Sequence, residues 1–199
     1  MIRKEKLEQL REIVENLKVI EVQEKSVELK NKFLQSTSYK IKLQNGRIII
    51  REKLIKGGKD GSASIIVPVT NDKEFLVAIE PRVFTELTVG VGFPAGYIEP
   101  GELPYKAALR ELQEETGYSS EQVTLLDIFY QDEGCSAALN HIYLAENIKK
   151  VSEPSLDEDE IIKYLFFNYE ELFELERLGY IKGCNTKLSL EKIKRIEKR

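Results

Sequence analysis

The sequence predicts an α/β fold, a mixed β-sheet packed between helices as an α/β/α sandwich, with a small N-terminal extension of one helix and strands. Three observations support it. Short runs of β-branched and aromatic residues, separated by turn residues, occupy the middle of the chain. One amphipathic helix pattern is embedded among them, and more helix patterns follow at the end. Hydrophobic residues make up 42% of the 199 residues, enough for a real core.

The N-terminal extension begins with an amphipathic helix at residues 4–18, whose apolar stripe consists of Leu7, Leu10, Val14 and Leu17. Short strands are expected at Val19–Val22, Tyr39–Leu43 and Arg47–Ile50. Asn45-Gly46 predicts a two-residue hairpin turn, because both positions of such a turn favour positive φ. The Gly-rich run 56–61 predicts a flexible break. We therefore expect an extension at residues 1–58 and a main domain at residues 59–199.

The main domain alternates strands with turns before its helices begin. The expected strands are 64–69, 75–79, 123–130, 141–145 and 163–167, and the expected later helices are 169–178 and 188–198. A polar turn joins the first two strands. An acidic segment, Glu153–Glu160, reads as a loop. Because strands flank an embedded helix, the pattern is typical of a sheet covered on both faces.

Bulk properties exclude several classes of protein. There is no run of eighteen apolar residues, so no membrane span is expected. The N-terminus lacks the apolar centre of a signal peptide. Cys135 and Cys184 lack metal-type spacing, which favours two reduced thiols in a cytoplasmic protein. The pI is about 5.4, and no basic stripe with interleaved aromatic residues is present, so nucleic acid is not expected as a partner.

Charge is distributed unevenly along the chain. Residues 1–60 carry 15 Lys and Arg against 9 Asp and Glu, whereas residues 61–199 carry 15 against 25. A basic first part beside an acidic second part suits an anionic ligand held with divalent cations on the acidic side. Random drift of surface charge explains the same distribution equally well.

The stretch from Gly96 to Tyr118 concentrates more constraints than any other. Pro104 fits the first turn of a helix, where its missing N–H costs nothing. Gly117 fits the left-handed position that ends a helix. Between them runs an apolar stripe that we expect to pack on the sheet, formed by Tyr105, Ala108, Leu109 and Leu112.

Acidic residues occupy a flanking face of the same helix. Glu111 and Glu115 stand four residues apart, so their carboxylates are neighbours, and Arg110 can pair with Glu114. Two adjacent glutamates destabilise a helix by about 0.2–0.5 kcal/mol, and a divalent cation between them reverses that sign. Hard oxygen ligands suit Mg²⁺ or Mn²⁺. A solvated, Glu-rich helix is the alternative, and for a glutamate pair alone it is the better interpretation.

The whole segment matches a longer pattern, G-x5-E-x7-R-E-U-x-E-E-x-G-U, where U is apolar or bulky. The matching residues are Gly96, Glu102, Arg110, Glu111, Leu112, Glu114, Glu115, Gly117 and Tyr118. This segment resembles the Nudix box of the Nudix hydrolase family. The resemblance implies a Nudix α/β/α sandwich whose loop-helix-loop box binds divalent metal. It also implies an enzyme that cleaves a nucleoside diphosphate linked to another moiety, by attack of water at phosphorus.

The resemblance implies a role for individual residues. The implied metal ligands are Glu111, Glu115 and the carbonyl of Ala95. Glu114 would be a metal or orienting group, and Arg110 would hold the glutamates in place. Glu102 would brace the loop, and Gly96 and Gly117 are the structural glycines of the motif. The bound metal would polarise the phosphoryl oxygens and lower the pKa of the attacking water.

Most of residues 45–190 resemble one branch of this family, the ADP-ribose pyrophosphatases and nucleoside-diphosphate-sugar hydrolases. The matching segments are Arg51-Glu52, Glu80-Pro-Arg82, Pro94-Ala-Gly96, 130–136, 141–145, 157–161, 169–172 and 179–181. This implies Mg²⁺-dependent hydrolysis of ADP-ribose or a related sugar nucleotide to a nucleoside monophosphate and a sugar phosphate. It also implies a homodimer, in which the N-terminal piece pairs the subunits and completes the substrate site.

Other candidate residues lie outside the box. Water attack needs a carboxylate that reaches the site from elsewhere, and a mobile loop can supply one. The acidic loop matches the branch at 157–161, and this resemblance implies Glu158 as the candidate general base and Glu160 as a further metal ligand. Arg51 and Arg82 would bind phosphate or the terminal ribose, and Gly134 lies in a loop expected to contact substrate. Each of these residues, taken alone, is also an ordinary surface residue.

Two departures from the branch leave the substrate open. Glu133 precedes Gly134 where the branch usually has proline, and Ala137-Ala138 replace an acidic pair. The alternatives are another nucleoside diphosphate derivative, such as a dinucleoside polyphosphate or coenzyme A, and a non-catalytic module that senses a nucleotide or binds a protein. The intact glutamates of the box favour an enzyme over the last of these.

Overall fold

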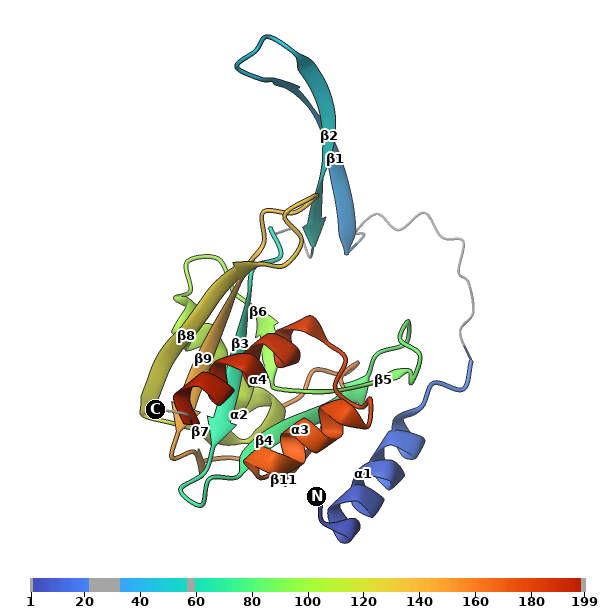
Figure 1. The fold of residues 1–199 in the computed structure, drawn as a ribbon, viewed down its shortest axis with the longest axis vertical. Helices are drawn as coiled ribbons and strands as arrows, with labels where there is room; N and C mark the ends of the chain where they lie inside the picture. The colour runs from blue at the N-terminus through green and yellow to red at the C-terminus, as the bar shows by residue number, and fades with distance from the viewer. Residues whose placement is uncertain (1, 22–32, 57–59, 198–199) are drawn as a thin grey trace.

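Helices cover both faces of one mixed β-sheet in the computed structural model, which describes residues 2–21, 33–56 and 60–197 (Figure 1). The helices are α1 (Lys4–Leu17), α2 (Pro104–Thr116), α3 (Tyr169–Arg177) and α4 (Cys184–Glu197). The strands are β1 (Leu34–Lys42), β2 (Ile48–Lys56), β3 (Ala63–Val69), β4 (Phe75–Pro81), β5 (Val89–Gly92), β6 (Ala95–Tyr97), β7 (Tyr118–Ser119), β8 (Gln122–Tyr130), β9 (Leu139–Glu146), β10 (Lys149–Lys150) and β11 (Lys163–Phe167). The predicted sandwich is confirmed.

The main sheet runs in the order β11-β4-β3-β9-β8, with β5 paired to β4 and β6 paired to β3. Only the β3–β9 pair in this sheet is parallel among the described strands, from Ala63 opposite Asn140 to Val69 opposite Glu146. β3 and β4 are buried along most of their length, which explains their nearly continuous apolar sequences. Strand β6 was not predicted, because three residues that include a glycine carry no strand pattern.

Each face of the sheet has its own apolar cluster. On one face, Ala108 and Leu112 of α2 pack against Ile66 and Tyr143. On the other, side chains of α1, α3 and α4 share one cluster with β3, β4, β5 and β11. The expectation that Tyr105 packs on the sheet was wrong. Its side chain is 41% exposed, because the buried residues in this part of helix α2 are Ala107 and Ala108.

Helix α1 is docked onto the body of the protein. Leu10 and Val14 are buried in the cluster beneath α3 and β4. Arg3 Nε donates to Glu171 Oε1 at 2.7 Å, and both Arg3 and Lys6 also bond to Glu74. Burial raises the pKa of Glu171, but the hydrogen bonds from Arg3 and from backbone N–H groups outweigh it and hold that pKa at about 2.

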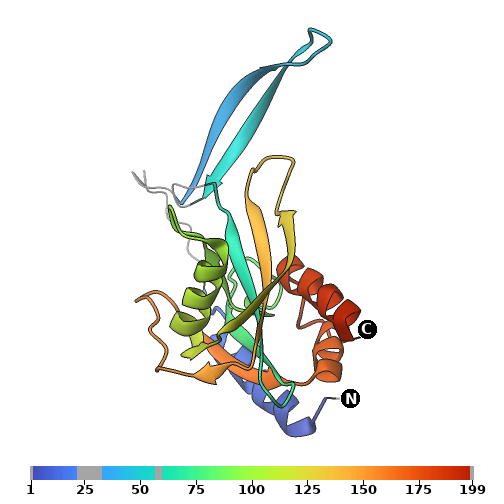
Figure 2. The same cartoon turned by 90° about the vertical axis from the view of Figure 1, so that its left-hand side faces the viewer.

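Strands β1 and β2 form an antiparallel hairpin that projects away from the body (Figures 1 and 2). The predicted two-residue turn was wrong. Gly46 N–H donates to Leu43 O and Leu43 N–H donates to Arg47 O, both at 2.9 Å, which leaves a three-residue loop. Gly46 has φ +82°, whereas Asn45 has no positive φ. This is a three-residue loop that ends in one left-handed residue, and it needs glycine at a single position.

Two other expectations were only partly right. Residues 19–21 form no strand, and Val22 lies outside the described residues. Helix α4 begins at Cys184, four residues before the predicted start, because Gly183 and Asn185 do not look like helix residues in isolation. Part of the predicted break at 56–61 also lies outside the described residues, so the division at residue 58 stays a prediction. Within the described chain, no helix is long and apolar enough to cross a membrane.

Candidate active site

Helix α2 holds the box glutamates, and its two ends are fixed by the residues that predicted them. Pro104 occupies the first turn. Gly117 ends the helix at φ +79°, and its N–H donates to Gln113 O at 2.8 Å. A Cβ at Gly117 would lie 2.1 Å from the carbonyl oxygen of Ser152, so no other residue fits there. The helix therefore presents its acidic face at a fixed place above β3 and β6.

Arg110 connects three carboxylates of the box. Its Nε and Nη2 donate to the two oxygens of Glu102 at 2.9 and 3.0 Å. Its Nη1 donates to Glu111 Oε1 at 2.7 Å and to Glu114 Oε2 at 2.9 Å, which confirms the predicted pair. Nη2 also reaches Tyr97 O at 3.0 Å. The hydrogen bonds to these carboxylates raise the pKa of Arg110 further. Only the planar fork of arginine satisfies this many partners at once.

Two further contacts fix the loop before the helix. Glu102 Oε2 accepts the N–H of Glu99 at 2.9 Å, which closes the turn before the helix. A Cβ at Gly96 would lie 2.0 Å from the carboxyl group of Glu111. Gly96 does not have a positive φ, so backbone conformation does not explain the glycine at this position. Its missing side chain instead leaves room for the Glu111 carboxylate.

Glu115 is the most buried carboxylate of the site, with 7% of its surface exposed. Burial raises its pKa well above the usual value, and the charges of Glu80, Glu111 and Glu160 raise it further. A hydrogen bond from the backbone of Ala95 opposes the shift. Four carboxylates and the backbone of Ala95 thus converge on one region.

Glu80, at the end of β4, is the member of this group that the sequence analysis missed. Burial raises its pKa, the charge of Arg82 lowers it, and Glu160 raises it again. The signal was present, since an acidic residue directly follows the buried run that ends at Ile79. An ionisable group there needs a partner or a function.

The acidic loop contacts the C-terminal end of helix α2. Ser155 N–H donates to Glu114 O at 2.8 Å, and Ser152 N–H donates to Gly117 O at 3.1 Å. Glu160 raises the pKa values of Glu80, Glu111 and Glu115, so its charge faces the cluster. Glu158 lies in the exposed turn beside it, and no hydrogen bond or ion pair among the described residues joins it to the cluster.

The donor set fits a divalent cation. Carboxylate oxygens are the ligands that Mg²⁺ and Mn²⁺ prefer, and mutually repelling, largely buried carboxylates are stabilised by a cation between them. In the described chain no group of three or more His, Cys, Asp and Glu side chains is arranged so that it could hold a metal ion as it stands. The hydrogen bond from Arg110 to Glu111 gives one reason, because it draws that carboxylate toward the guanidinium.

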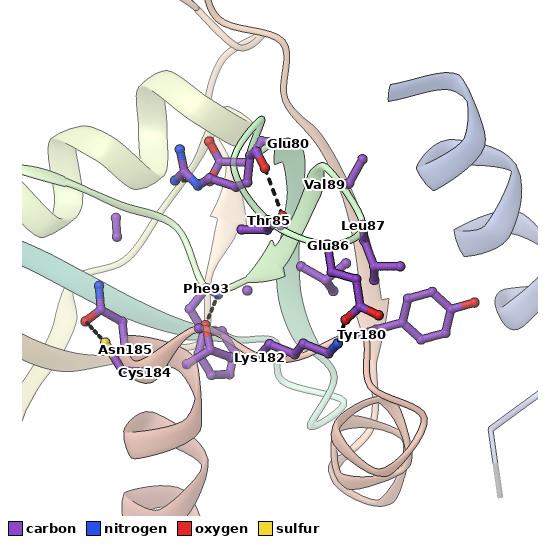
Figure 3. A pocket seen from close by; sticks show the side chains of 17 residues that line it. Glu80, Thr85, Glu86, Leu87, Val89, Phe93, Tyr180, Lys182, Cys184 and Asn185 are labelled. Atoms are coloured by element: carbon purple, nitrogen blue, oxygen red, sulfur yellow. Dashed lines mark hydrogen bonds and ion pairs between the residues drawn. The ribbon is translucent and has the colours of Figure 1, made fainter. Parts of the chain in front are cut away.

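Arg82 lines the cavity drawn in Figure 3, together with Glu80 and Ala95. Its guanidinium forms an ion pair with Glu80. Its side chain lies over Gly90, where a Cβ would come within 2.6 Å of Arg82 Cγ. The structure therefore brings this predicted substrate-binding residue to the site.

The structure places Arg51 and Gly134 near the hairpin instead. Arg51 is exposed on β2, and its Nη1 donates to Ile50 O at 2.8 Å. Gly134 lies in the exposed loop after β8, where the neighbouring Cys135 O accepts the N–H of Leu54 at 2.7 Å. That bond ties the hairpin base to the loop. Neither Arg51 nor Gly134 contacts the carboxylates among the described residues.

Comparisons with known proteins agree with this geometry. A family model described as the NUDIX domain matches residues 60–183. The chain is 31% identical over 152 residues to an ADP-ribose pyrophosphatase of Bacillus subtilis, covering 76% of this chain and 80% of that protein. It is 36% identical over 143 residues to a methanol dehydrogenase activator of Bacillus methanolicus, covering 71% and 72%.

A solved structure supports the fold independently. The crystal structure of an ADP compounds hydrolase superposes with a TM-score of 0.73 at 23% identity, covering 85% of this chain and 89% of that one. At this identity the likeness speaks for the fold alone.

Proposed function

Because the chain belongs to the Nudix family, we propose that it is a Mg²⁺-dependent hydrolase that cleaves the diphosphate bond of ADP-ribose or a related nucleoside diphosphate sugar. The products are a nucleoside monophosphate and a sugar phosphate. One observation carries the proposal. The box is complete, and the charges of Glu80, Glu111 and Glu160 raise the pKa of its buried Glu115. The names of the pyrophosphatase relative and of an ADP-sugar pyrophosphatase of Mus musculus, 36% identical over 88 residues, support the substrate class.

Glu111, Glu115, Glu160 and the carbonyl of Ala95 would hold the cation, and Glu80, whose charge raises the pKa of Glu115, would join them. A bound divalent cation there supplies charge neutralisation at the phosphate oxygens and a more acidic attacking water. Mn²⁺ offers the same ligand preference as Mg²⁺.

The protein's own side chains carry out the remaining work. Arg110 keeps Glu111 and Glu114 in position through the bonds described above, so the carboxylates are oriented before substrate arrives. Arg82 presents a guanidinium suited to a phosphate oxygen. Glu158 sits in an exposed turn of the acidic loop, and closure of this loop over the site would bring it in as general base.

The projecting hairpin supports a homodimer as the working unit. A two-stranded hairpin is marginally stable on its own in water, and this one exposes a series of apolar side chains. They are Leu34, Tyr39, Ile41, Leu43, Ile48 and Ile50. Arg51 shares a face with Tyr39, its cross-strand partner. In a dimer paired through the hairpins, Arg51 would reach the partner's substrate site.

The test is phosphate-coupled turnover with Mg²⁺ on a panel of ADP-ribose, ADP-glucose, a dinucleoside polyphosphate and coenzyme A, with products identified by chromatography. We expect AMP and ribose 5-phosphate from ADP-ribose at the highest kcat/KM in the panel. Faster turnover of the polyphosphate or of coenzyme A would replace the proposed substrate class. No turnover of any compound would contradict the enzyme itself and leave the sensing module.

A further inference from the structure

We infer that Thr88 is a positioning residue for Arg82, and that the segment after helix α1 holds Thr88 in place, an inference that rests on the proposed function. Arg82 and Thr88 stand at the two ends of the loop between β4 and β5. The N-terminal extension passes beside this loop as it leaves α1 (Figure 1). A helix outside the box thereby fixes a side chain that contacts the substrate.

Both backbone polar groups of Arg82 are bonded inside this loop. Its N–H donates to Thr88 O at 2.8 Å. Its carbonyl oxygen accepts the N–H of Thr85 at 2.9 Å and the hydroxyl of Thr85 at 2.8 Å. Thr88 N–H donates to Thr85 O at 2.9 Å, which completes the loop. The direction in which the Arg82 side chain leaves the backbone therefore depends on where Thr88 places its carbonyl oxygen.

Thr88 has a backbone conformation that is unusual for its residue type. Its φ is +55°, in the left-handed region. The other described non-glycine residues with positive φ are Lys73 and Asn147, and neither is β-branched. A β-branched residue is strained in this region, and it persists there only where its surroundings fix it. Such strained residues concentrate at functional sites, which makes the contacts of Thr88 informative.

The segment after α1 supplies a contact that fixes Thr88. Val19 is partly buried, and its N–H donates to Thr88 Oγ1 at 3.0 Å. One residue, Lys18, separates Val19 from the end of the helix. The helix is itself anchored, because Leu10 and Val14 are buried in the core. The hydrogen bond therefore ties the strained residue to a rigid part of the molecule.

A second contact holds the middle of the loop less firmly. Glu86 forms an ion pair with Lys182, which follows α3. Their side chains are 77% and 57% exposed, and an ion pair this exposed contributes little to stability because water and salt screen it. The pair also acts two residues away from Thr88. The Val19–Thr88 bond is therefore the contact that we expect to fix the end of the loop.

The Arg82 side chain depends on the loop because the rest of the protein does not enclose it. The side chain is 54% exposed. It lies over Gly90 and forms an ion pair with Glu80. A displaced Arg82 backbone would carry the guanidinium away from Glu80 and from the phosphate proposed to bind there. A shift of about 1 Å in a group that orients substrate lowers the rate by as much as about a hundredfold.

The experiment removes the hydrogen bond from either side and measures turnover of ADP-ribose with Mg²⁺. Thr88→Val removes the acceptor hydroxyl, and Thr88→Ser keeps it. Val19→Pro removes the donor, and Val19→Ala keeps it. Lys18 already has ψ +136°, the conformation that the residue before a proline favours. Thr70→Val is the matched control, because Thr70 Oγ1 accepts the N–H of Glu74 at 3.1 Å at the opposite end of β4.

We expect Thr88→Val and Val19→Pro each to lower kcat/KM about tenfold, and both together to lower it no further, because they remove one bond. Thr88→Ser, Val19→Ala and Thr70→Val should stay within about twofold of wild type. In an Arg82→Ala background, Thr88→Val should cause no further loss, because Thr88 acts through Arg82. An unchanged kcat/KM in Thr88→Val, or a further tenfold loss in the Arg82→Ala background, would overturn the inference.

Hydrogen exchange of the Arg82 amide, followed by NMR, tests the loop independently of turnover. Exchange should be slow in wild type, Thr88→Ser and Val19→Ala, and about tenfold faster in Thr88→Val and Val19→Pro. Equal exchange in all five proteins would overturn the inference. Faster exchange with unchanged kcat/KM would overturn the positioning role. A wild type that turns over no nucleotide, with the exchange difference present, would instead refute the proposed function and leave the link between α1 and the loop.

Discussion

At the scale of single residues, the geometry of the site depends on Gly96, Gly117 and Arg110. Gly96 is required by the carboxylate above it and not by its backbone angles. We predict that Gly96→Ala displaces Glu111 and lowers kcat by about a hundredfold, because a small misplacement of a catalytic group has that effect. The folded state should lose little stability, since the carboxylate can move toward solvent.

Gly179→Ala is the matched control for that substitution. Gly179 has φ +83° at the end of α3, away from the carboxylates. Alanine in the left-handed region costs about 1–2 kcal/mol. The thermal unfolding temperature of Gly179→Ala should therefore be lower than that of the wild type, whereas its kcat should equal the wild-type value. If Gly96→Ala kept full kcat, the explanation given for this glycine would be wrong.

Arg110→Lys tests whether a single charge can replace the guanidinium fork. Lysine keeps the positive charge but cannot bond to Glu102, Glu111 and Glu114 together. We expect the free energy of unfolding to fall by about 1–3 kcal/mol and kcat to fall more than KM rises. Urea denaturation and steady-state kinetics measure the two effects. An unchanged kcat would mean that the carboxylates do not need Arg110 for their orientation.

The local sequence was sufficient to predict most of this geometry. Gly117, Pro104 and the Arg110–Glu114 pair follow from helix periodicity and capping, which are local properties. Glu80 did not follow, because its position relative to Glu115 depends on β4 lying beside β3, the strand on which helix α2 packs. The position of Glu160 depends in the same way on where the acidic loop crosses the helix end.

At the scale of elements, helix α1 is held by an ion network that responds to pH. Glu171 has a folded-state pKa of about 2, below its ordinary value of 4.5. A depressed pKa contributes stability that is present above the unfolded pKa and is lost as pH falls from about 4.5 toward 2. Glu171→Gln should therefore cost about 1–2 kcal/mol at pH 7, reduced by screening at the half-exposed Arg3.

Chemical denaturation of Glu171→Gln at several pH values measures this. The difference from wild type should shrink as pH falls below 4.5 and disappear near pH 2. Glu170→Gln, a neighbour exposed on the same helix, should match wild type throughout. A deficit that persists unchanged at low pH would mean that the carboxylate charge is not what holds α1.

The β1–β2 hairpin is the element whose sequence and surroundings conflict, since its apolar side chains are exposed. We predict a dimer that Ile48→Thr combined with Ile50→Thr weakens about tenfold or more, because threonine keeps the strand preference and removes apolar area. Lys53→Thr, on the other face of strand β2, is the control. Light scattering at micromolar concentration measures the mass. A monomeric wild type would contradict the hairpin's assigned role.

Elements were predicted best where burial alternates in a simple way. Strand β11 has its predicted bounds because its more and less buried residues alternate. The acidic loop before it and the helix-capping residue Asn168 after it mark its two ends. Strands β1 and β2 extend further than predicted, because polar residues such as those around Ser36 pair by backbone bonds that carry no hydrophobic signal. The docking of α1 was visible as an apolar stripe, but its target on α3 and β4 was not.

At the scale of the whole molecule, the fold brings the glutamates of helix α2 together with Glu80 of β4 and Glu160 of the acidic loop. Glu115 is buried among these carboxylates, and this burial raises its pKa. Because the pKa of Glu115 is raised in the metal-free folded protein, the free energy of unfolding falls as pH rises through that pKa. Glu115→Gln should thus fold at least as well as wild type at pH 7 without metal.

Turnover of ADP-ribose by wild type, Glu115→Gln and the exposed control Glu121→Gln, each with Mg²⁺ and with EDTA, tests the central claim most directly. Thermal unfolding in the same buffers shows whether the cation binds. The account predicts that wild type and Glu121→Gln turn over substrate and gain stability only with Mg²⁺. Glu115→Gln should lose about a hundredfold or more in kcat and gain no stability from the cation. Full activity of Glu115→Gln, or equal activity in EDTA, would contradict it.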